Sequence, residues 1–186
     1  MNAGNVEREV KLRFASPGAA RTAILATEAT PLKPRRLQDD RLLDTSDGQL
    51  RERRCVLRVR REGDTSVITF KGPTQPSRMK LRPEIETAVG DATRVLDILA
   101  ELGFVAWFRY QKYREEFSAP GVVVALDETP VGTFVEVEGD ERSIDRMASR
   151  LGRTSDDYLV KSYFVIFNEW RQQTGSNATD MVFDAS

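Results

Sequence analysis

The chain has 186 residues, 40% of them hydrophobic, which is enough for one domain with one core. Its formal net charge is −1 although 31% of its residues are charged, so the composition predicts no nucleic-acid partner. The chain has no histidine, which excludes a Ser-His-Asp or Cys-His triad and a zinc site built on imidazole groups. Any metal would have to be held by carboxylates, which favours Mg²⁺ or Mn²⁺.

The beginning of the chain is charged, and no apolar stretch is long enough to cross a membrane. The sequence therefore predicts no signal peptide and no membrane partner. The single cysteine, Cys55, cannot form an internal disulfide, which fits a reducing compartment. These features together predict a cytoplasmic protein.

Residues 6–14 alternate between charged and apolar side chains, as in a β-strand. One face carries Glu7, Glu9, Lys11 and Arg13, and the other carries Val6, Val10, Leu12 and Phe14. Ser16 and Pro17 then predict the start of a helix that ends near residue 28. Residues 30–36 contain two prolines and are predicted to form a loop, and 41–45 a short strand.

The middle and end of the chain repeat the pattern of the first strand. Alternation predicts strands over 56–60, 66–71, 81–87, 105–117, 122–127 and 133–138. Apolar spacing predicts helices over 91–102, around 144–151 and over 158–170. Cys55 is interpreted as a small strand residue, and Tyr163, Phe164, Phe167 and Trp170 as core residues. The sequence predicts one domain over 1–170 and a polar, flexible tail over 171–186.

The charged faces of these strands form one coherent set. An open sheet with one wet face explains each pair of charges alone, but not the segregation of Arg/Lys pairs and Glu pairs onto separate strands. We therefore predict an α+β fold: an eight-stranded antiparallel β-barrel with a charged interior, covered outside by amphipathic helices. Arginines and lysines in such a tunnel suit a linear polyanion, and carboxylates there suit divalent cations that bridge it.

The order of the charged motifs resembles the CYTH domain family, also called the triphosphate tunnel metalloenzymes, over about residues 5–168. The resemblance rests on Glu7-x-Glu9-x-Lys11, Arg58-x-Arg60, Thr69-x-Lys71-Gly72-Pro73, Arg82-x-Glu84-x-Glu86, Lys112-x-Arg114, Asp127, Gly132-x-Phe134-x-Glu136-x-Glu138 and Tyr158-x-x-Lys161-Ser162-Tyr163. One departure is Leu42-Leu43, where the family commonly has an aromatic pair.

The resemblance implies a tunnel that binds a triphosphate together with Mg²⁺ or Mn²⁺. The implied phosphate-binding residues are Lys11, Arg58, Arg60, Lys71, Arg82, Lys112, Arg114 and Lys161. The implied metal ligands are Glu7, Glu9, Glu84, Glu86, Asp127, Glu136 and Glu138. Glu7, Glu9, Lys11 and Lys161 are the implied catalytic residues, in a two-metal transfer of a phosphoryl group to water.

Three functions are compatible with these residues. The leading hypothesis is a metal-dependent triphosphatase that acts on inorganic tripolyphosphate, a nucleoside triphosphate or thiamine triphosphate. The first alternative is a class IV-like adenylate cyclase, which would release pyrophosphate from ATP. The second is a non-catalytic sensor of polyphosphate or nucleotides, which the complete set of carboxylates disfavours, because binding alone needs the basic residues more.

Overall fold

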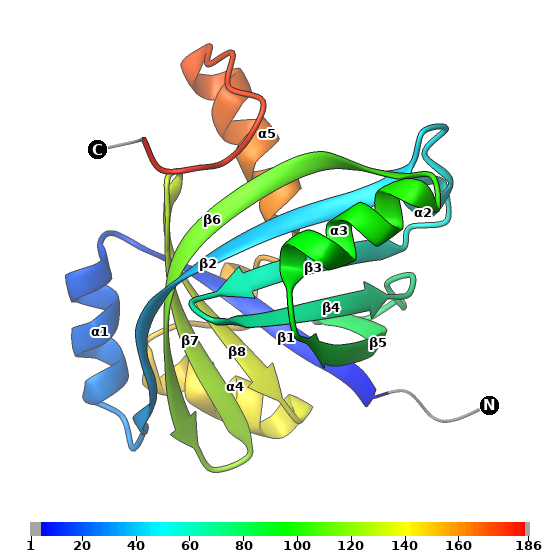
Figure 1. Cartoon of the computed structure of the whole chain (residues 1–186). Helices are drawn as coiled ribbons and strands as arrows, with labels where there is room; N and C mark the ends of the chain where they lie inside the picture. The colour runs from blue at the N-terminus through cyan, green and yellow to red at the C-terminus, as the bar shows by residue number, and fades with distance from the viewer. Residues whose placement is uncertain (1–4, 185–186) are drawn as a thin grey trace.

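The computed structural model describes residues 5–184 and forms one closed antiparallel barrel (Figure 1). Its strands are β1 (Asn5–Phe14), β2 (Thr30–Thr45), β3 (Val56–Glu62), β4 (Thr65–Lys71), β5 (Lys80–Val89), β6 (Phe104–Ala119), β7 (Val122–Thr129) and β8 (Gly132–Gly139). Around the barrel they follow the order β1-β5-β4-β3-β2-β6-β7-β8. β1 closes it by pairing with β5 through residues 5–9 and with β8 through residues 9–14.

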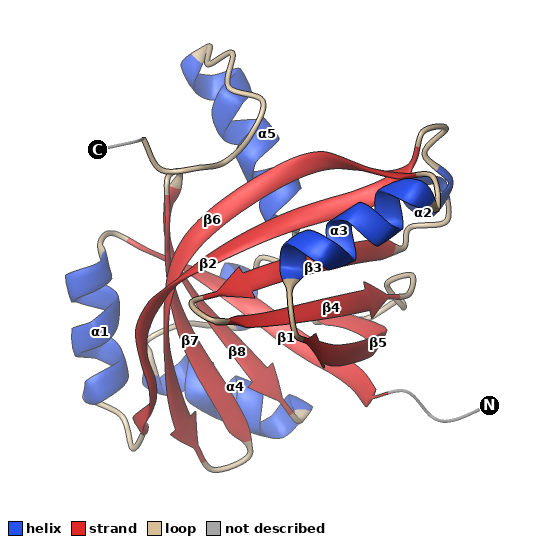
Figure 2. Cartoon of the chain, viewed as in Figure 1, coloured by secondary structure: helices blue, strands red, loops and turns tan. Residues whose placement is uncertain are grey.

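The helices lie outside the barrel (Figure 2). They are α1 (Pro17–Leu25), α2 (Gln49–Glu52), α3 (Ala92–Glu101), α4 (Glu141–Arg150) and α5 (Tyr163–Thr174), with a 3₁₀ turn over Ser155–Asp157. α1 and α4 pack on β7 and β8, and α3 packs on β3 and β6. The predicted α+β barrel with helices outside is confirmed. Within residues 5–184, every helix is too short or too polar to span a membrane.

The alternation seen in the sequence decides which side of each strand faces the core. Val10 and Leu12 of β1 point outward and are completely buried against Ile24 of α1 and Ile144 of α4. Their neighbour Lys11 points inward and is only 2% exposed. Burial of the outward apolar faces under helices therefore stabilises a barrel whose interior is charged.

The predicted loop over residues 30–36 is wrong, because these residues are the first half of β2. β2 pairs with β6 along almost its whole length but with β3 only through Asp39–Leu43. Pro31 and Pro34 therefore lie where one edge of the strand is free, beside two shifts in register. Proline is tolerated at such open edges and bulges because no ladder hydrogen bond is lost.

The predicted helix over 158–170 starts five residues too early. Leu159 is extended and exchanges two backbone hydrogen bonds with Lys11, at 2.9 and 3.2 Å. α5 begins only at Tyr163, where the Ser162 hydroxyl accepts a hydrogen bond from the Val165 amide. A serine N-cap of this kind fixes the start of a helix more strongly than apolar spacing does.

The chain after α5 runs back along β6, which differs from the predicted loose tail after residue 170. Met181 is buried, its amide donates to the Arg109 carbonyl at 3.0 Å, and its carbonyl accepts from the Gln111 amide at 2.8 Å. β6 pairs with β7 only from Tyr113 onward, so these bonds satisfy an otherwise open edge.

Gly139 is predicted to be a position where the barrel tolerates no side chain. A Cβ there would overlap the Gly121 carbonyl oxygen in the close pairing of β7 and β8. We expect Gly139→Ala to lower the free energy of unfolding by about 3 kcal/mol, measured by urea denaturation. A Cβ at Gly90 would meet no described atom within 4 Å, so Gly90→Ala is the matched control. Equal stability of the two variants would contradict this account.

Candidate functional site

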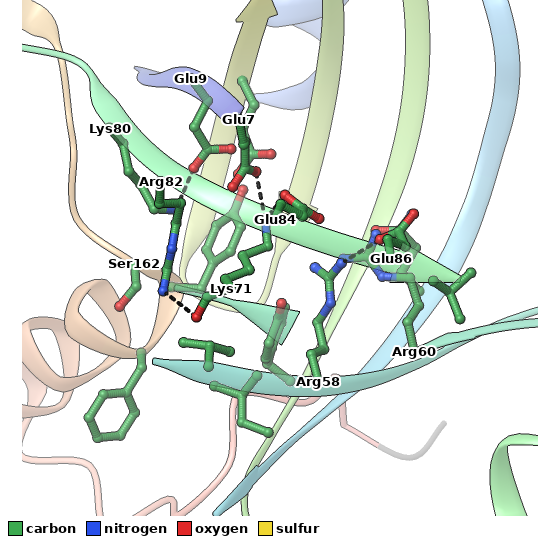
Figure 3. Close-up of a pocket in the computed structure, with 18 of the residues that line it drawn as sticks. Glu7, Glu9, Arg58, Arg60, Lys71, Lys80, Arg82, Glu84, Glu86 and Ser162 are labelled. Carbon is green, nitrogen blue, oxygen red and sulfur yellow. Dashed lines mark hydrogen bonds and ion pairs between the residues drawn. The ribbon is translucent and has the colours of Figure 1, made fainter. Parts of the chain in front are cut away.

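The inward side chains surround a cavity of about 1190 Å³. Figure 3 shows part of its wall, where acidic and basic side chains of β1, β3, β4 and β5 point toward one another. Apart from Asp127, all site residues predicted from the sequence line it: Glu7, Glu9, Lys11, Arg58, Arg60, Lys71, Arg82, Glu84, Glu86, Lys112, Arg114, Glu136, Glu138 and Lys161. A second cavity of about 540 Å³ shares five lining residues with the first: Lys33, Arg114, Glu116, Glu136 and Glu138.

Three lysines lie beside the carboxylates of β1. Lys71 Nζ is 2.6 Å from Glu7 Oε1, and Lys80 Nζ is 2.5 Å from Glu9 Oε1. Lys11 Nζ lies 2.9 Å from the same oxygen of Glu9. Burial alone would raise the pKa of Glu9, but Lys11 and Lys80 outweigh it and hold the pKa well below its usual range. Glu9 is therefore ionised and shared between two ammonium groups.

Glu7 and Glu138 lie near Glu9, and the positive charge around them does not offset the effect of burial on their pKa values. Glu7 Oε2 is buried and has no hydrogen-bond partner in the described part of the chain. Burial raises the pKa of Glu7, and the Glu9 carboxylate raises it further. Burial and then Glu7 and Glu9 raise the pKa of Glu138 to about 7. Solvent reaches Glu138, so screening reduces the size of this shift but leaves its direction.

These carboxylates fit a divalent cation that binds together with a phosphate ligand. Among residues 5–184, no three acidic side chains converge into a ready-made metal site. Mg²⁺ commonly binds through one or two carboxylates plus phosphate oxygens rather than in an all-protein cage. The crowding of the Glu7, Glu9 and Glu138 carboxylates is the feature that such a cation would relieve.

Arg58 and Arg60 of β3 form a basic wall that shares one buried counterion, Asp40 of β2. Arg60 Nε is 2.8 Å from Asp40 Oδ1, and Arg58 Nε is 3.4 Å from the same atom. Arg58 Nη2 also donates to Thr69 and Glu86, at 3.0 and 3.3 Å. One fully buried carboxylate thus serves two guanidinium groups, and the second acidic contact of Arg58, Glu86, is 47% exposed.

Arg82 lines the cavity, but its guanidinium is bound to backbone carbonyls. Its Nε and Nη2 donate to the Gly72 carbonyl at 2.9 and 2.6 Å, and Nη2 also reaches the carbonyls of Lys71 and Arg54. These bonds tie the turn after β4 and the turn before β3 to β5. Its predicted phosphate contact stays a prediction.

Asp127 lies behind the cavity wall and is completely buried. Lys112 Nζ is 2.7 Å and Arg114 Nε 2.6 Å from its carboxylate, and the Tyr163 hydroxyl donates to it at 2.6 Å. Burial and Arg114 lower the pKa of Lys112 to about 8. Asp127 thus already accepts hydrogen bonds from three donors. Tyr163, which the sequence predicts to be a core residue, is buried and also belongs to this network.

The remaining predicted acidic ligands are likewise paired with basic residues. Lys71 contacts Glu84 at 2.9 Å, and Glu136 accepts from both Lys11 and Arg114. The predicted metal roles of Glu84, Glu86, Asp127 and Glu136 stay predictions.

The start of α5 faces the cavity, and residues 160–165 line it. The unpaired amides and the dipole at a helix N-terminus favour a bound anion. Lys161 directly precedes this helix, but its Nζ lies 2.6 Å from Glu169, and its side chain is 47% exposed. Lys161 therefore lies at the rim of the cavity rather than inside it.

The structure adds interior residues that the sequence analysis missed: Arg36, Gln38, Asp40, Glu62 and Lys80. Lys80 lies two residues before Arg82 in the same alternation, so extending the predicted strand would have found it. Gln38 and Asp40 continue the alternation of β2 upstream of residue 41. They were missed because the predicted loop ended at residue 36 and the predicted strand began only at residue 41.

We predict that Glu138 makes cation binding depend on pH. Burial and the neighbouring carboxylates raise its pKa above the usual value for glutamate, so on acidification it takes up a proton that a cation must displace. Mg²⁺ affinity, measured by calorimetry with a non-hydrolysable triphosphate present, should therefore rise with pH up to the pKa of Glu138. The Mg²⁺ affinity of the Glu138→Gln variant should show only the pH dependence that comes from protonation of the triphosphate itself. Identical pH profiles for the two proteins would rule out this role.

Comparison with known proteins identifies the family. Residues 5–163 match the model of the CYTH domain. The chain is 30% identical over 140 residues to "Putative adenylate cyclase MJ0240" from Methanocaldococcus jannaschii, a match that covers 69% of this chain and 80% of the relative.

Solved structures share the fold. An X-ray structure of a Vibrio parahaemolyticus protein, described as a putative adenylate cyclase, has a TM-score of 0.75 at 20% identity and covers 89% of this chain and 99% of its own. HpAC1 from Hippeastrum, described as an adenylyl cyclase candidate with a dominant triphosphatase activity, has a TM-score of 0.68 at 20% identity, over 88% and 95% of the two chains. The chain belongs to the CYTH domain family.

Proposed function

We propose that this protein is a metal-dependent triphosphatase that releases orthophosphate from a triphosphate substrate inside the barrel. The observation that carries the proposal is the pairing of basic and acidic groups across the cavity, as between Lys71 and Glu7 and between Lys80 and Glu9. A triphosphate would bind the lysines in place of the carboxylates, and a divalent cation would bind the carboxylates in place of the lysines. Either ligand alone would leave buried charges unpaired, so the two should bind together.

The phosphate chain would lie along the basic wall. Arg58 and Arg60 offer guanidinium groups that bind phosphate oxygens in forked geometry, and Lys71 and Lys80 add two ammonium groups. Mg²⁺ or Mn²⁺ would be held by Glu7, Glu9 and Glu138. When bound, such a cation polarises phosphate oxygens and makes a water molecule more acidic.

Hydrolysis requires water to attack the terminal phosphorus while the bond to the bridging oxygen breaks. The departing diphosphate keeps that electron pair, and Lys71 and Arg58 neutralise its charge. Glu7 would accept the proton of the attacking water, because its Oε2 is unpartnered and because burial and the Glu9 carboxylate raise its pKa.

Adenylate cyclase is the second candidate, favoured by the name of the Methanocaldococcus relative. The same phosphate and metal ligands would then serve attack by the ribose 3′-hydroxyl on the α-phosphorus, with pyrophosphate as the leaving group. The triphosphatase ranks first because water needs no positioned ribose, and because the described activity of HpAC1 is dominated by triphosphate hydrolysis.

The products decide between these functions. Purified protein is given tripolyphosphate, ATP or thiamine triphosphate with Mg²⁺, with Mn²⁺ or with EDTA, and phosphate products are separated by ion chromatography. The proposal expects orthophosphate that appears only with metal. Pyrophosphate and a cyclic nucleotide from ATP would establish a cyclase. Tight binding without turnover would make the protein a sensor.

A further inference from the structure

One end of the cavity differs from the charged remainder because it is aromatic and apolar. Arg51, Trp107, Phe164 and Val165 line this end, here called the aromatic mouth. The rings of Trp107 and Phe164 meet edge to face, 4.8 Å between centroids. Tripolyphosphate offers nothing that would use an apolar wall, whereas an organic triphosphate does.

A β-bulge turns Trp107 toward the cavity. Leu42 of β2 pairs with Phe108, and Leu43 pairs with Ala106, so Trp107 is left without a partner across the ladder. A bulge of this kind re-aims one side chain and is over-represented beside binding sites. Trp107 therefore lines the cavity, whereas its neighbour Phe108 is buried and does not line it.

A buried carboxylate fixes a guanidinium over the Trp107 ring. Asp44 is 1% exposed and accepts from the Arg51 amide at 3.0 Å and from Arg51 Nε at 2.9 Å. This holds the Arg51 guanidinium 4.7 Å from the centre of the Trp107 ring. Arg51 is otherwise half exposed, so its outer face is open to a ligand. A flat guanidinium or an indole each offers a surface on which an aromatic ring stacks.

The aromatic mouth lies within reach of the basic wall. Leu42 pairs with Arg58 on one side and with Phe108 on the other. Two strand spacings, about 10 Å, therefore separate the backbone of Arg58 from that of the bulge. A ligand whose phosphates contact Arg58 can place its organic group against Trp107.

We propose, resting on the proposed triphosphatase function, that the aromatic mouth binds the aromatic ring of an organic triphosphate and selects it over inorganic tripolyphosphate. The shared chemistry is a planar heteroaromatic base linked to a triphosphate, as in a nucleoside triphosphate or thiamine triphosphate. Stacking on an aromatic residue corresponds to a change of about 5- to 150-fold in affinity.

Kinetics test this selectivity. The test is to measure kcat/KM for ATP, thiamine triphosphate and tripolyphosphate in wild type, Trp107→Ala and Trp107→Leu. Trp170→Phe is the control, because the Trp170 side chain packs on Phe167 of α5. Wild type should prefer one aromatic triphosphate over tripolyphosphate by at least about tenfold. Both Trp107 variants should lose that preference while their tripolyphosphate turnover stays within about twofold of wild type, which also shows that they fold. A preference for tripolyphosphate, or an equal loss on all substrates, would overturn the inference.

Fluorescence separates failure of this inference from failure of the proposed function. The chain has two tryptophans, so Trp170→Phe leaves Trp107 as the only indole. With Mg²⁺ present, ATP or thiamine triphosphate should change the Trp107 emission at saturation, and saturating tripolyphosphate should not. This result would support the inference even in a protein without turnover. An unchanged emission on binding of both aromatic triphosphates would overturn it, whatever the catalytic activity.

Discussion

Replacing Glu7 by glutamine should lower kcat/KM for triphosphate hydrolysis by about a thousandfold, within the range that a general base contributes. The substitution keeps the size of the side chain and its contact with Lys71, but it removes the basic oxygen that is buried without a partner. Steady-state kinetics at saturating Mg²⁺ measures the loss, and calorimetry with the same substrate measures binding separately.

The matched control for Glu7 is a carboxylate on the outside of the barrel. Glu115 of β6 contacts Arg21 of α1 at 3.1 Å and does not line the cavity. Glu115→Gln should keep kcat/KM within about twofold of wild type. If Glu7→Gln binds the substrate and turns it over at the wild-type rate, the role assigned to Glu7 is wrong.

Replacing Asp40 by asparagine should cost the metal-free protein about 3 kcal/mol of unfolding free energy. Asp40 is completely buried between Arg58 and Arg60, and the neutral amide leaves both guanidinium groups without their shared counterion. Urea denaturation measures the loss. A bound polyanion would replace the missing charge, so saturating tripolyphosphate with Mg²⁺ should stabilise the variant more than it stabilises wild type.

Asp64 provides the comparison for Asp40. It lies exposed in the turn between β3 and β4, and Asp64→Asn should change the stability by less than about 0.5 kcal/mol. If Asp40→Asn proves as stable as Asp64→Asn, Asp40 is not the counterion that holds the basic wall together.

Much of the barrel could be predicted because each strand carries its own alternation. In β1, Lys11 faces inward and Leu12 outward, as their spacing requires, and the same holds for Arg58 and Val59 of β3. The charged interior follows from these local patterns, because burying the apolar faces outside leaves the charged faces inside. The match to the CYTH domain confirms the family that the order of motifs resembles.

The features that sequence could not supply depend on pairing between distant strands. Pro34 is compatible with β2 only because β3 is absent from that part of its edge, which no local pattern reveals. Trp107 looks like one residue of an alternating strand, and only the register against Leu42 and Leu43 shows the bulge. Ion-pair partners such as Asp40 and Arg60 lie twenty positions apart, so they emerge only from the fold.

Hydrolysis of a triphosphate at its terminal phosphorus can be observed directly in the charged cavity's reaction with ATP. ³¹P NMR of one sample of wild-type protein with ATP and Mg²⁺ follows every phosphorus atom at once. We expect the γ signal of ATP to be replaced by that of orthophosphate while the α and β signals become those of ADP. Appearance of pyrophosphate with a cyclic phosphodiester, or an unchanged spectrum for ATP, thiamine triphosphate and tripolyphosphate alike, would contradict it.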